Sequence, residues 1–533
     1  MIDSVRAWLR KHPRARWFYP IWILLTVAVF AVAAATNGIF LPGYACLLAL
    51  IVFALRPGSA VYGVTLEKGR YIRRLLTLLV ALITVAACIL PMDMLPIWNG
   101  EVPGHRNQYE LMAENILDGR IYFDYGDEAG LMEMENPYDR DARDKDGVRY
   151  HWDHAFYNGR YYMYFGIVPV FLAFLPYRIL TGTALTTFHA TQLFTALTIA
   201  GIFILFDLLA KRFFKRLPYC VYLALSVAFS VMSVWYAAAE PALYCTAITA
   251  GLALEVWSLY FFIRAVYVEK RENKQIFLAG IGALLGALVF GCRPTIALAN
   301  LLVIPMVITF VKQREFDGKL LGKLVLAALP YALVAAGLML YNYARFDDPF
   351  EFGQKYQLTV ADQSQYSIAL NADTILRIIN DTVKNFFAFG DIRSGFPYLY
   401  PSSVFFNFPI LLLLAGVCKV SVLKNMHYAK VLPLMLGILV TALVITAMDI
   451  LWTPYLLERY RMDIYFLLGI GCFLTVGFWY NICTAKQRRL LSACLSILAV
   501  LTVVSAFLLC VYRVGVYYPS KVKEIGQILQ LIQ

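Results

Sequence analysis

Long apolar stretches alternate with short polar ones along the whole chain. A helix that crosses a bilayer needs ~20 apolar residues, and stretches of that kind recur throughout the sequence. The pattern predicts thirteen spans, at 17–36, 39–55, 72–91, 184–209, 217–237, 242–265, 276–292, 294–311, 323–343, 404–422, 431–452, 462–483 and 490–512. It therefore predicts an all-α polytopic membrane protein, because a β-barrel would show ~10-residue alternating segments instead.

One apolar stretch does not fit this pattern. Residues 166–182 are apolar but short, and they contain Pro169 and Pro176. If this stretch crossed the bilayer, every later loop would change sides, and the basic clusters would face outward. We therefore expect it to lie in the membrane interface or to re-enter from the outer side, where protein can satisfy its backbone.

Two long polar segments interrupt the spans, at 92–165 (loop 1) and 344–403 (loop 2). Each contains an amphipathic pattern with helical spacing. The first helix is expected at 107–118 and the second at 372–389, with Asn371 as its N-cap. Both are expected to lie on the outer membrane surface. The chain then divides into an N-terminal two-helix extension, a membrane core, loop 2 and C-terminal membrane helices, at 1–71, 72–343, 344–403 and 404–533.

Composition and charge sharpen this picture. Of the 533 residues, 60% are hydrophobic and 15% are charged, which excludes a soluble enzyme, a disordered chain and a disulfide-stapled secreted module. The segments expected in the cytoplasm hold 28 of the 47 Lys and Arg residues and only six acids. By the positive-inside rule this predicts a cytoplasmic N-terminus and an outer C-terminus. Loop 1 is acidic, with 15 acids and 7 basic residues.

The candidate chemistry lies in the outer segments. The chain has no nucleotide-binding glycine loop and no HExxH motif, so an ATP-driven pump or a membrane zinc protease is not indicated. The run 136–166 combines acids with aromatic rings, which suits a carbohydrate site; an interfacial aromatic belt is the alternative. The acids between 139 and 146 lack the pattern of a calcium loop. His151 and His154 beside Asp153 are only a weak metal signal. We predict no cofactor; a divalent metal is an open alternative that the sequence does not support.

Several stretches resemble the GT-C superfamily of integral-membrane glycosyltransferases, the relatives of protein O-mannosyltransferases and aminoarabinose transferases. The stretches are QYELMAENILDGRIY at 108–122, YNGRYYMYFGIVPVFLAFLPYRILTG at 157–182, GCRPT at 291–295, NYARFDDPFEFGQKYQLT at 342–359 and LERYRMD at 457–463. The last two look like motifs of bacterial members. The resemblance implies an inverting enzyme that moves a sugar from a polyprenyl-phosphate donor to a cell-envelope glycan or protein. It would act at the outer face of the plasma membrane by general-base catalysis.

The resemblance also implies roles for particular residues. Many members carry a catalytic Asp just before the first surface helix, where this chain has His105 and Arg106. The base is therefore expected to be Asp153 or, second, Glu101. The donor phosphate would contact cationic groups, and the sugar or acceptor would contact aromatic rings. The cationic candidates are Arg106, Arg293, Arg459 and His154, and the aromatic candidates are Trp152, Tyr157, Tyr161 and Tyr109.

Other functions remain open. The ERYRMD run at 458–463 could be a phosphate clamp or a structural ion-pair cap. A transporter or flippase of a lipid-linked glycan would usually show paired broken helices in two related halves. A non-catalytic envelope scaffold with a GT-C-like fold would explain the missing Asp.

Overall fold

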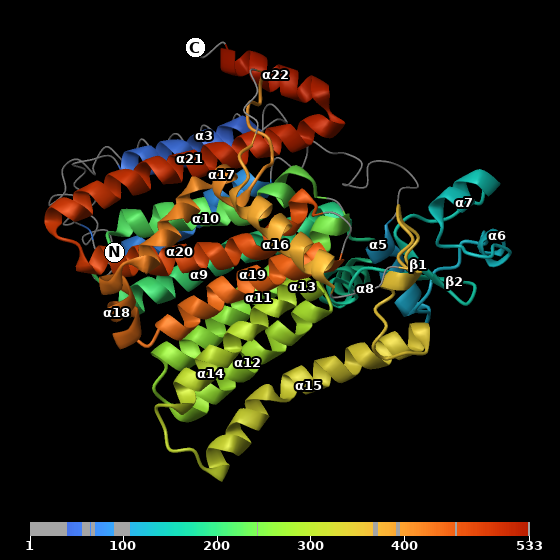
Figure 1. The fold of residues 1–533 in the computed structure, drawn as a ribbon, viewed down its shortest axis with the longest axis horizontal. Helices are drawn as coiled ribbons and strands as arrows, with labels where there is room; N and C mark the ends of the chain where they lie inside the picture. Colours follow the sequence, from blue (N-terminus) through green and yellow to red (C-terminus); the bar gives the residue numbers. More distant parts are fainter. Residues whose placement is uncertain are drawn as a thin grey trace.

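The computed structural model describes residues 40–55, 64, 70–89, 107–241, 243–365, 371–390, 395–452 and 456–530. Long helices lie side by side in a bundle, and loop 1 projects from one end of it (Figure 1). In the described residues the sheet content is one two-stranded hairpin. The fold is therefore all-α, as the sequence predicts.

Nine helical segments of the described chain are long and apolar enough to cross a membrane. They are α9 (Thr187–Phe213), α10 (Tyr219–Ala239), α11 with η5 (Leu243–Val268), α12 (Glu272–Phe290), α13 to α14 (Pro294–Val311), α15 (Gly318–Phe346), α19 (Leu432–Trp452), η9 with α20 (Glu458–Ile482) and α21 (Ala485–Tyr517). Each overlaps a predicted span. The polytopic membrane architecture is thus confirmed at this level.

The other four predicted spans are not among these nine segments, so the count of thirteen spans stays a prediction. Residues 17–36 lie outside the described residues. The next two predicted spans correspond to α3 (Phe40–Leu55) and α4 (Arg70–Ile89). The span predicted at 404–422 is not one straight helix: η8 (Pro409–Cys418) and α18 (Val420–Tyr428) are bent by 78°. Counted as one span, this pair raises the total in the described chain to ten.

The apolar stretch at 166–182 forms η4 (Val170–Phe174) and α8 (Leu175–Thr181). At ~1.5 Å per residue, twelve helical residues reach about 18 Å, well short of the ~30 Å hydrocarbon layer. The stretch is held at its start, where the amide of Val168 donates to the carbonyl of Gly291 over 2.8 Å. A Cβ at Gly166 would lie 2.2 Å from that same carbonyl oxygen, so only glycine allows this approach. The short helix agrees with the prediction that this stretch does not cross.

The described part of loop 1 begins with Asn107 and α5 (Gln108–Leu117). The Asn107 side chain caps the first turn by accepting from the amides of Tyr109 and Glu110. The predicted helix is confirmed, but its expected place on the membrane surface is not. Tyr109, Met112 and Ala113 are buried, and α5 packs against η4, α8 and β2. Most of its apolar face is therefore covered by the chain itself, and Leu117 at its end is exposed.

The rest of loop 1 contains α6 (Ala129–Met132), α7 (Arg140–Asp146) and a β-hairpin that the sequence analysis did not predict. Strands β1 (His154–Tyr157) and β2 (Arg160–Met163) pair antiparallel, with His154 opposite Met163. Asn158 and Gly159 turn between them with positive φ, as a two-residue hairpin requires. Loop 2 adds to this hairpin, because the amide of Leu358 donates to the carbonyl of His154 over 2.8 Å.

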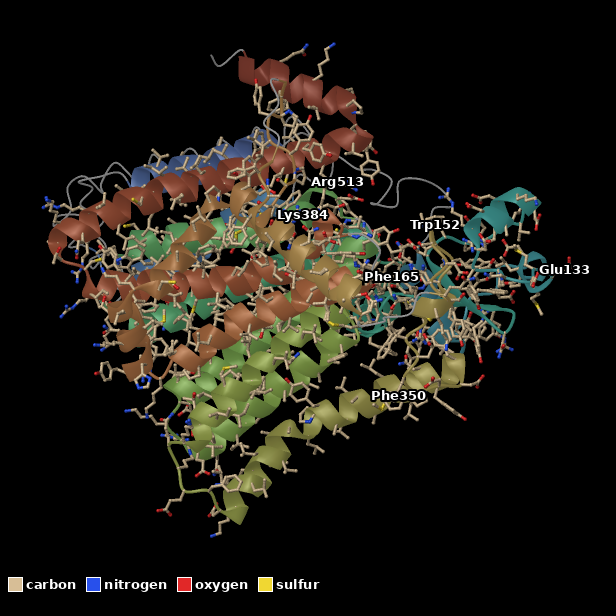
Figure 2. The ribbon with its side chains drawn as sticks, in the orientation of Figure 1. Glu133, Trp152, Phe165, Phe350, Lys384 and Arg513 are labelled. Atoms are coloured by element: carbon tan, nitrogen blue, oxygen red, sulfur yellow. The ribbon has the colours of Figure 1, made fainter. Side chains whose placement is uncertain are left out.

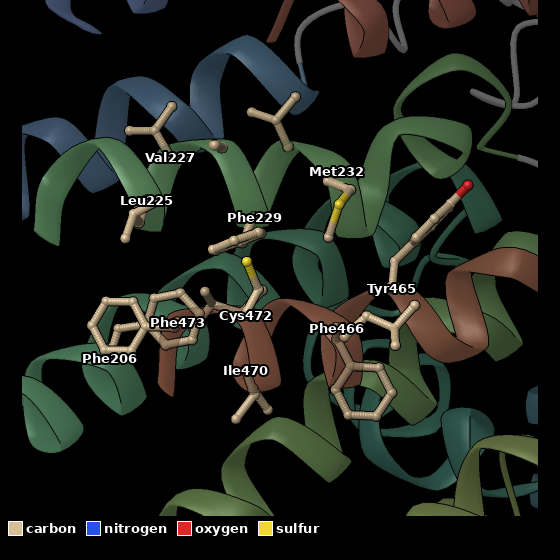
Figure 3. Packing of buried hydrophobic residues seen from close by; sticks show 14 of the residues in the cluster. Phe206, Leu225, Val227, Phe229, Met232, Tyr465, Phe466, Ile470, Cys472 and Phe473 are labelled. Carbon is tan, nitrogen blue, oxygen red and sulfur yellow. The ribbon is translucent and has the colours of Figure 1, made fainter. Parts of the chain in front are cut away.

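The spans share one large hydrophobic core that includes residues from Tyr44 to Ile525. Helices α10 and α20 lie at its centre, and α9, α11 and α21 pack around them. Figure 3 shows Phe206 of α9 against Phe473 of α20, with ring centroids 4.1 Å apart. The predicted C-terminal helices therefore belong to the same core as the earlier spans. This common core fixes the span ends against which the loops pack.

Candidate functional site

A cavity of about 580 Å³ lies where loop 1 and loop 2 meet the ends of the spans. Loop 1 contributes Asp153 to its wall, the turn after α12 contributes Arg293, α15 contributes Arg345, loop 2 contributes Gln357 and η9 contributes Arg459. In Figure 2, Trp152 and Phe165, which also line the cavity, lie between the bundle and the tip of loop 1 that carries Glu133. The polar residues therefore converge from five separate parts of the chain.

Asp153 has an unusual backbone conformation, with φ of +56°. Non-glycine residues rarely adopt it, and Asp and Asn tolerate it best. Three backbone contacts hold it. The side-chain amide of Gln108, on α5, donates to the backbone carbonyl of Asp153 over 2.7 Å. The backbone amide of Asp153 donates to the carbonyl of Leu358 over 2.9 Å, and the carbonyl of His154, the next residue, accepts from the amide of Leu358. Asp153 is thus clamped between α5 and loop 2.

Asp153 is 5% exposed, and neutral donors that include Tyr244, Gln357 and Thr359 hold its carboxylate. The hydroxyl of Tyr244, at the start of α11, donates to one oxygen, and the side-chain amide of Gln357 donates to the other over 2.8 Å. Burial raises the pKa of Asp153, although these donors and the charge of Arg459 oppose the rise. A buried carboxylate with a raised pKa is typical of a general base.

Three guanidiniums line the cavity, and their partners differ. Arg293 donates to the buried carboxylate of Asp463 over 2.7 Å, so its charge is compensated. Arg459 stacks over the Tyr244 ring at 4.1 Å, and Arg345 donates to the Met163 carbonyl over 2.7 Å. Among the described residues, neither Arg459 nor Arg345 lies within 4.0 Å of a carboxylate. These two cations are therefore available to an anion in the cavity.

The structure divides the predicted site residues into three groups. Trp152, Asp153, Arg293 and Arg459 line the cavity, whereas Glu101 and Arg106 lie outside the described residues. The remaining four are buried or placed elsewhere: Tyr109 stacks on Phe174 beneath α5, Tyr157 packs on Tyr356, and Tyr161 and His154 belong to an aromatic cluster around Tyr125. None of these four forms part of the cavity wall, so their predicted contacts with sugar or phosphate find no support here.

His154, predicted as a cationic contact for the donor phosphate, is a neutral side chain in the structure. Burial lowers the pKa of His154 to about 4. Its Nδ1 lies 3.0 Å from the carbonyl of Trp152, and its Nε2 lies 2.9 Å from the hydroxyl of Tyr125. A ring that donates at Nδ1 and accepts at Nε2 is neutral. His154 therefore supports the hairpin and does not supply positive charge to a phosphate.

From the sequence, no role in this site was assigned to Tyr244, Gln357 or Gln108, and Arg345 was noted only as one of the few basic residues of the outer segments. Arg345 carried a signal, because a basic residue at the end of a span is uncommon in an acidic loop region. Gln108 and Gln357 lie in the stretches 108–122 and 342–359 that resemble GT-C motifs, whereas Tyr244 carried no signal. Tyr244 and Gln357 lie 91 and 204 residues from Asp153 along the chain, and only the fold brings them together.

No family model matches this chain, and a comparison with characterised proteins finds no significant match. Within the described ranges, no three His, Cys, Asp or Glu side chains are grouped so that they could hold a metal ion. What the site offers is a buried carboxylate able to accept a proton and, in the same cavity, two guanidiniums that form no direct salt bridge within the described residues.

Proposed function

We propose that this protein is a GT-C-like membrane glycosyltransferase that moves a sugar from a polyprenyl-phosphate donor to a cell-envelope acceptor. One observation carries the proposal: the cavity at the boundary of spans and loops joins the Asp153 carboxylate with the guanidiniums of Arg459 and Arg345. A transfer from a lipid phosphate needs a base and an anion site within reach of the membrane, and this cavity combines them.

In the proposed reaction, Asp153 accepts the proton of an acceptor hydroxyl, and the hydroxyl oxygen attacks the anomeric carbon of the donor. The bond between that carbon and the phosphate oxygen breaks, and the configuration inverts. Arg459 and Arg345 stabilise the negative charge that develops on the departing phosphate. The raised pKa of Asp153 makes its carboxylate a stronger base than an exposed aspartate.

The cavity walls suit the two substrates. Phe290, Leu338 and Met448, which come from span ends, form an apolar side against which a lipid tail can lie. Trp152 lines the cavity and is 42% exposed, so its ring can pack on the C–H face of an acceptor sugar. We place the protein in a bacterial plasma membrane with a cytoplasmic N-terminus and an outer C-terminus, and the distribution of basic residues supports this orientation.

The test uses purified protein in lipid vesicles with undecaprenyl-phosphate-linked mannose or aminoarabinose, radiolabelled in the sugar, and an extract of envelope glycans. We expect label to appear in the glycan fraction and the wild-type rate to fall at least about 100-fold in Asp153→Asn, since general-base catalysis contributes typically 10²–10⁴-fold. Asparagine keeps the volume of the side chain and tolerates the left-handed backbone.

Asp347→Asn is the matched control. Asp347 also has a positive φ, of +57°, but it does not line the cavity, so its variant should transfer at the wild-type rate. Equal rates for wild type and Asp153→Asn would refute Asp153 as the base. No transfer from either donor, with donor crossing the bilayer unchanged, would favour a transporter instead.

A further inference from the structure

Helix α16 (Ala372–Phe387) of loop 2 presents a row of large apolar side chains that remain about half exposed or more, although Phe387 at its end contacts Phe405. Five large side chains on the helix are between 49% and 64% exposed: Ile375, Leu376, Ile379, Val383 and Phe387. At about 100° per residue, they fall within roughly 120° of the helix circumference. Scattered exposed apolar residues are ordinary, but a continuous row of this kind marks an interaction surface.

The two ends of α16 are attached to the ends of two spans. Near its start, Arg377 donates to the carbonyl of Ile450, in the last turn of α19, over 3.4 Å. Near its end, Asn385 accepts from Arg461, which directly precedes α20, over 2.8 Å. Because both spans end there, these contacts place α16 at the boundary of the bilayer.

The remaining faces of α16 complete a three-sided arrangement. Asn385 and Arg377, whose hydrogen bonds are given above, face the protein. Phe386 is also buried, at the C-terminal end of the apolar row, where it packs on Phe405. Asp373, Asn380 and Lys384 are exposed and follow the apolar row around the helix. A helix that rests on a bilayer has this order of faces, with apolar residues toward the acyl chains and charged residues toward water.

We infer that α16 is a membrane-docked helix whose apolar row is buried in the lipid of the bilayer surface. Lipid is present at this boundary without any partner protein, so it is the occupant that the position of the helix selects. Helix α5 shows the contrast, because Tyr109, Met112 and Ala113 of its apolar face are buried within the chain. The inference is independent of the proposed enzymatic function.

The experiment places a nitroxide spin label at single engineered cysteines in the full-length protein, in vesicles of phosphatidylethanolamine and phosphatidylglycerol. The exposed Cys418 and Cys494 are first replaced by serine, since the other eight cysteines are buried. Ile379→Cys and Val383→Cys probe the apolar row, and Asn380→Cys and Lys384→Cys are matched controls on the polar face. Collision rates are measured with oxygen, which concentrates in lipid, and with a water-soluble nickel chelate.

We expect oxygen to dominate at positions 379 and 383 and the nickel chelate to dominate at 380 and 384. The oxygen-to-nickel ratio should place position 379 about 5–10 Å below the headgroup boundary. Dominance of the nickel chelate at 379 and 383 would show that the row faces water and would overturn the inference. Exclusion of both reagents would show that protein covers the row, and this would overturn it equally.

Discussion

At the residue scale, Asp153 combines an unfavourable backbone conformation with a buried charge. A left-handed non-glycine residue costs about 1–3 kcal/mol and persists only where its surroundings hold it. Here the holding contacts come from Gln108 and Leu358. Gln108 is also buried, and its side-chain oxygen accepts from the backbone amide of Tyr164 over 3.1 Å. Gln108 is therefore a positioning residue for the proposed base.

Gln108→Met tests that role. The variant keeps the side-chain length but leaves the Asp153 carbonyl and the Tyr164 amide without their partner. If the carboxylate then moves by about 1 Å, the transfer rate can fall by up to about 100-fold, while unfolding stability falls by about 1–3 kcal/mol. Both are measured, with the rate normalised to folded protein. Gln313→Met, at a residue just after α14 (Val303–Val311) whose side-chain amide donates to the carbonyl of Thr309 in that helix, should leave the rate unchanged; an equal loss there would contradict the assignment.

The hydrogen bond from Tyr244 makes a prediction about pH. A general base works only when deprotonated, so the transfer rate should rise with pH through the pKa of Asp153, which burial holds above its ordinary value. The Tyr244 hydroxyl lowers that pKa. Tyr244→Phe should therefore raise it further and move the acid limb of the rate profile to higher pH. Tyr341→Phe removes another hydroxyl from the same cavity wall, and an equal shift in that control would argue against a specific effect.

At the scale of elements, a polar cluster joins four helical segments inside the membrane region. Glu255 lies on α11 and accepts from the amide of Asn300, on η6 (Leu298–Leu302), over 3.3 Å. The hydroxyl of Tyr331, on α15, donates to the oxygen of Asn300. The cluster fits because Gly286 of α12 has no side chain: a Cβ there would lie 2.1 Å from the Asn300 oxygen. Buried polar groups in a membrane are costly unless they are paired.

Gly286→Ala should therefore lower the melting temperature, with a cost of about 1–3 kcal/mol for the forced displacement. The same helix supplies a matched control. A Cβ at Gly280 meets no atom within 4 Å, so Gly280→Ala should leave stability unchanged or raise it, because alanine favours a helix. Thermal unfolding in one detergent measures both variants. Similar melting temperatures for the two would show that the cluster adapts to the extra methyl group.

The sequence predicted the elements that depend on local pattern. Nine spans follow from hydropathy alone, and the N-cap at Asn371 is confirmed by its bond from the amide of Thr374. The hairpin carried a local signal as well, the Asn158–Gly159 pair, that the analysis overlooked. The bend within 404–422 falls at Lys419, between η8 and α18, and the sequence analysis did not predict it. Asp153 was predicted because it lies in a run rich in acids and aromatic rings. Its contacts with Tyr244 and Gln357 could not be predicted, because these residues are 91 and 204 positions away and only the packing of the fold brings them to it.

At the scale of the whole molecule, the cavity and the basic clusters between the spans lie at opposite ends of the bundle. The cavity is formed where α12, α15 and α19 end and where η9 begins. Because successive spans alternate in direction, the basic clusters lie at the other end of the bundle. They are Lys211–Arg216, Lys270–Lys274, Lys312–Lys323, Lys419–Lys430 and Lys486–Arg489. This is the distribution that the positive-inside rule expects if the cavity opens outward.

Topology can be tested without reference to activity. Thr183, just after the short helix Val170–Thr181, and Arg216, after α9, are both exposed. In intact cells, a membrane-impermeant maleimide should label Thr183→Cys, whereas Arg216→Cys should react only after the membrane is permeabilised. If both variants reacted from the same side, α9 would not cross; labelling with the sides reversed would place the cavity in the cytoplasm.

The attachment of Asp153 to loop 2 also sets an order in time. Gln357, which holds the carboxylate, follows Asp153 by 204 residues. At a synthesis rate of about 5–20 residues per second, that separation corresponds to roughly 10–40 s. During that interval loop 1 has been made, but its key side chain has neither its second donor nor its backbone partner. The cavity is therefore completed late in biogenesis, and a chain released before loop 2 would carry the aspartate without the contacts that hold its carboxylate in the cavity.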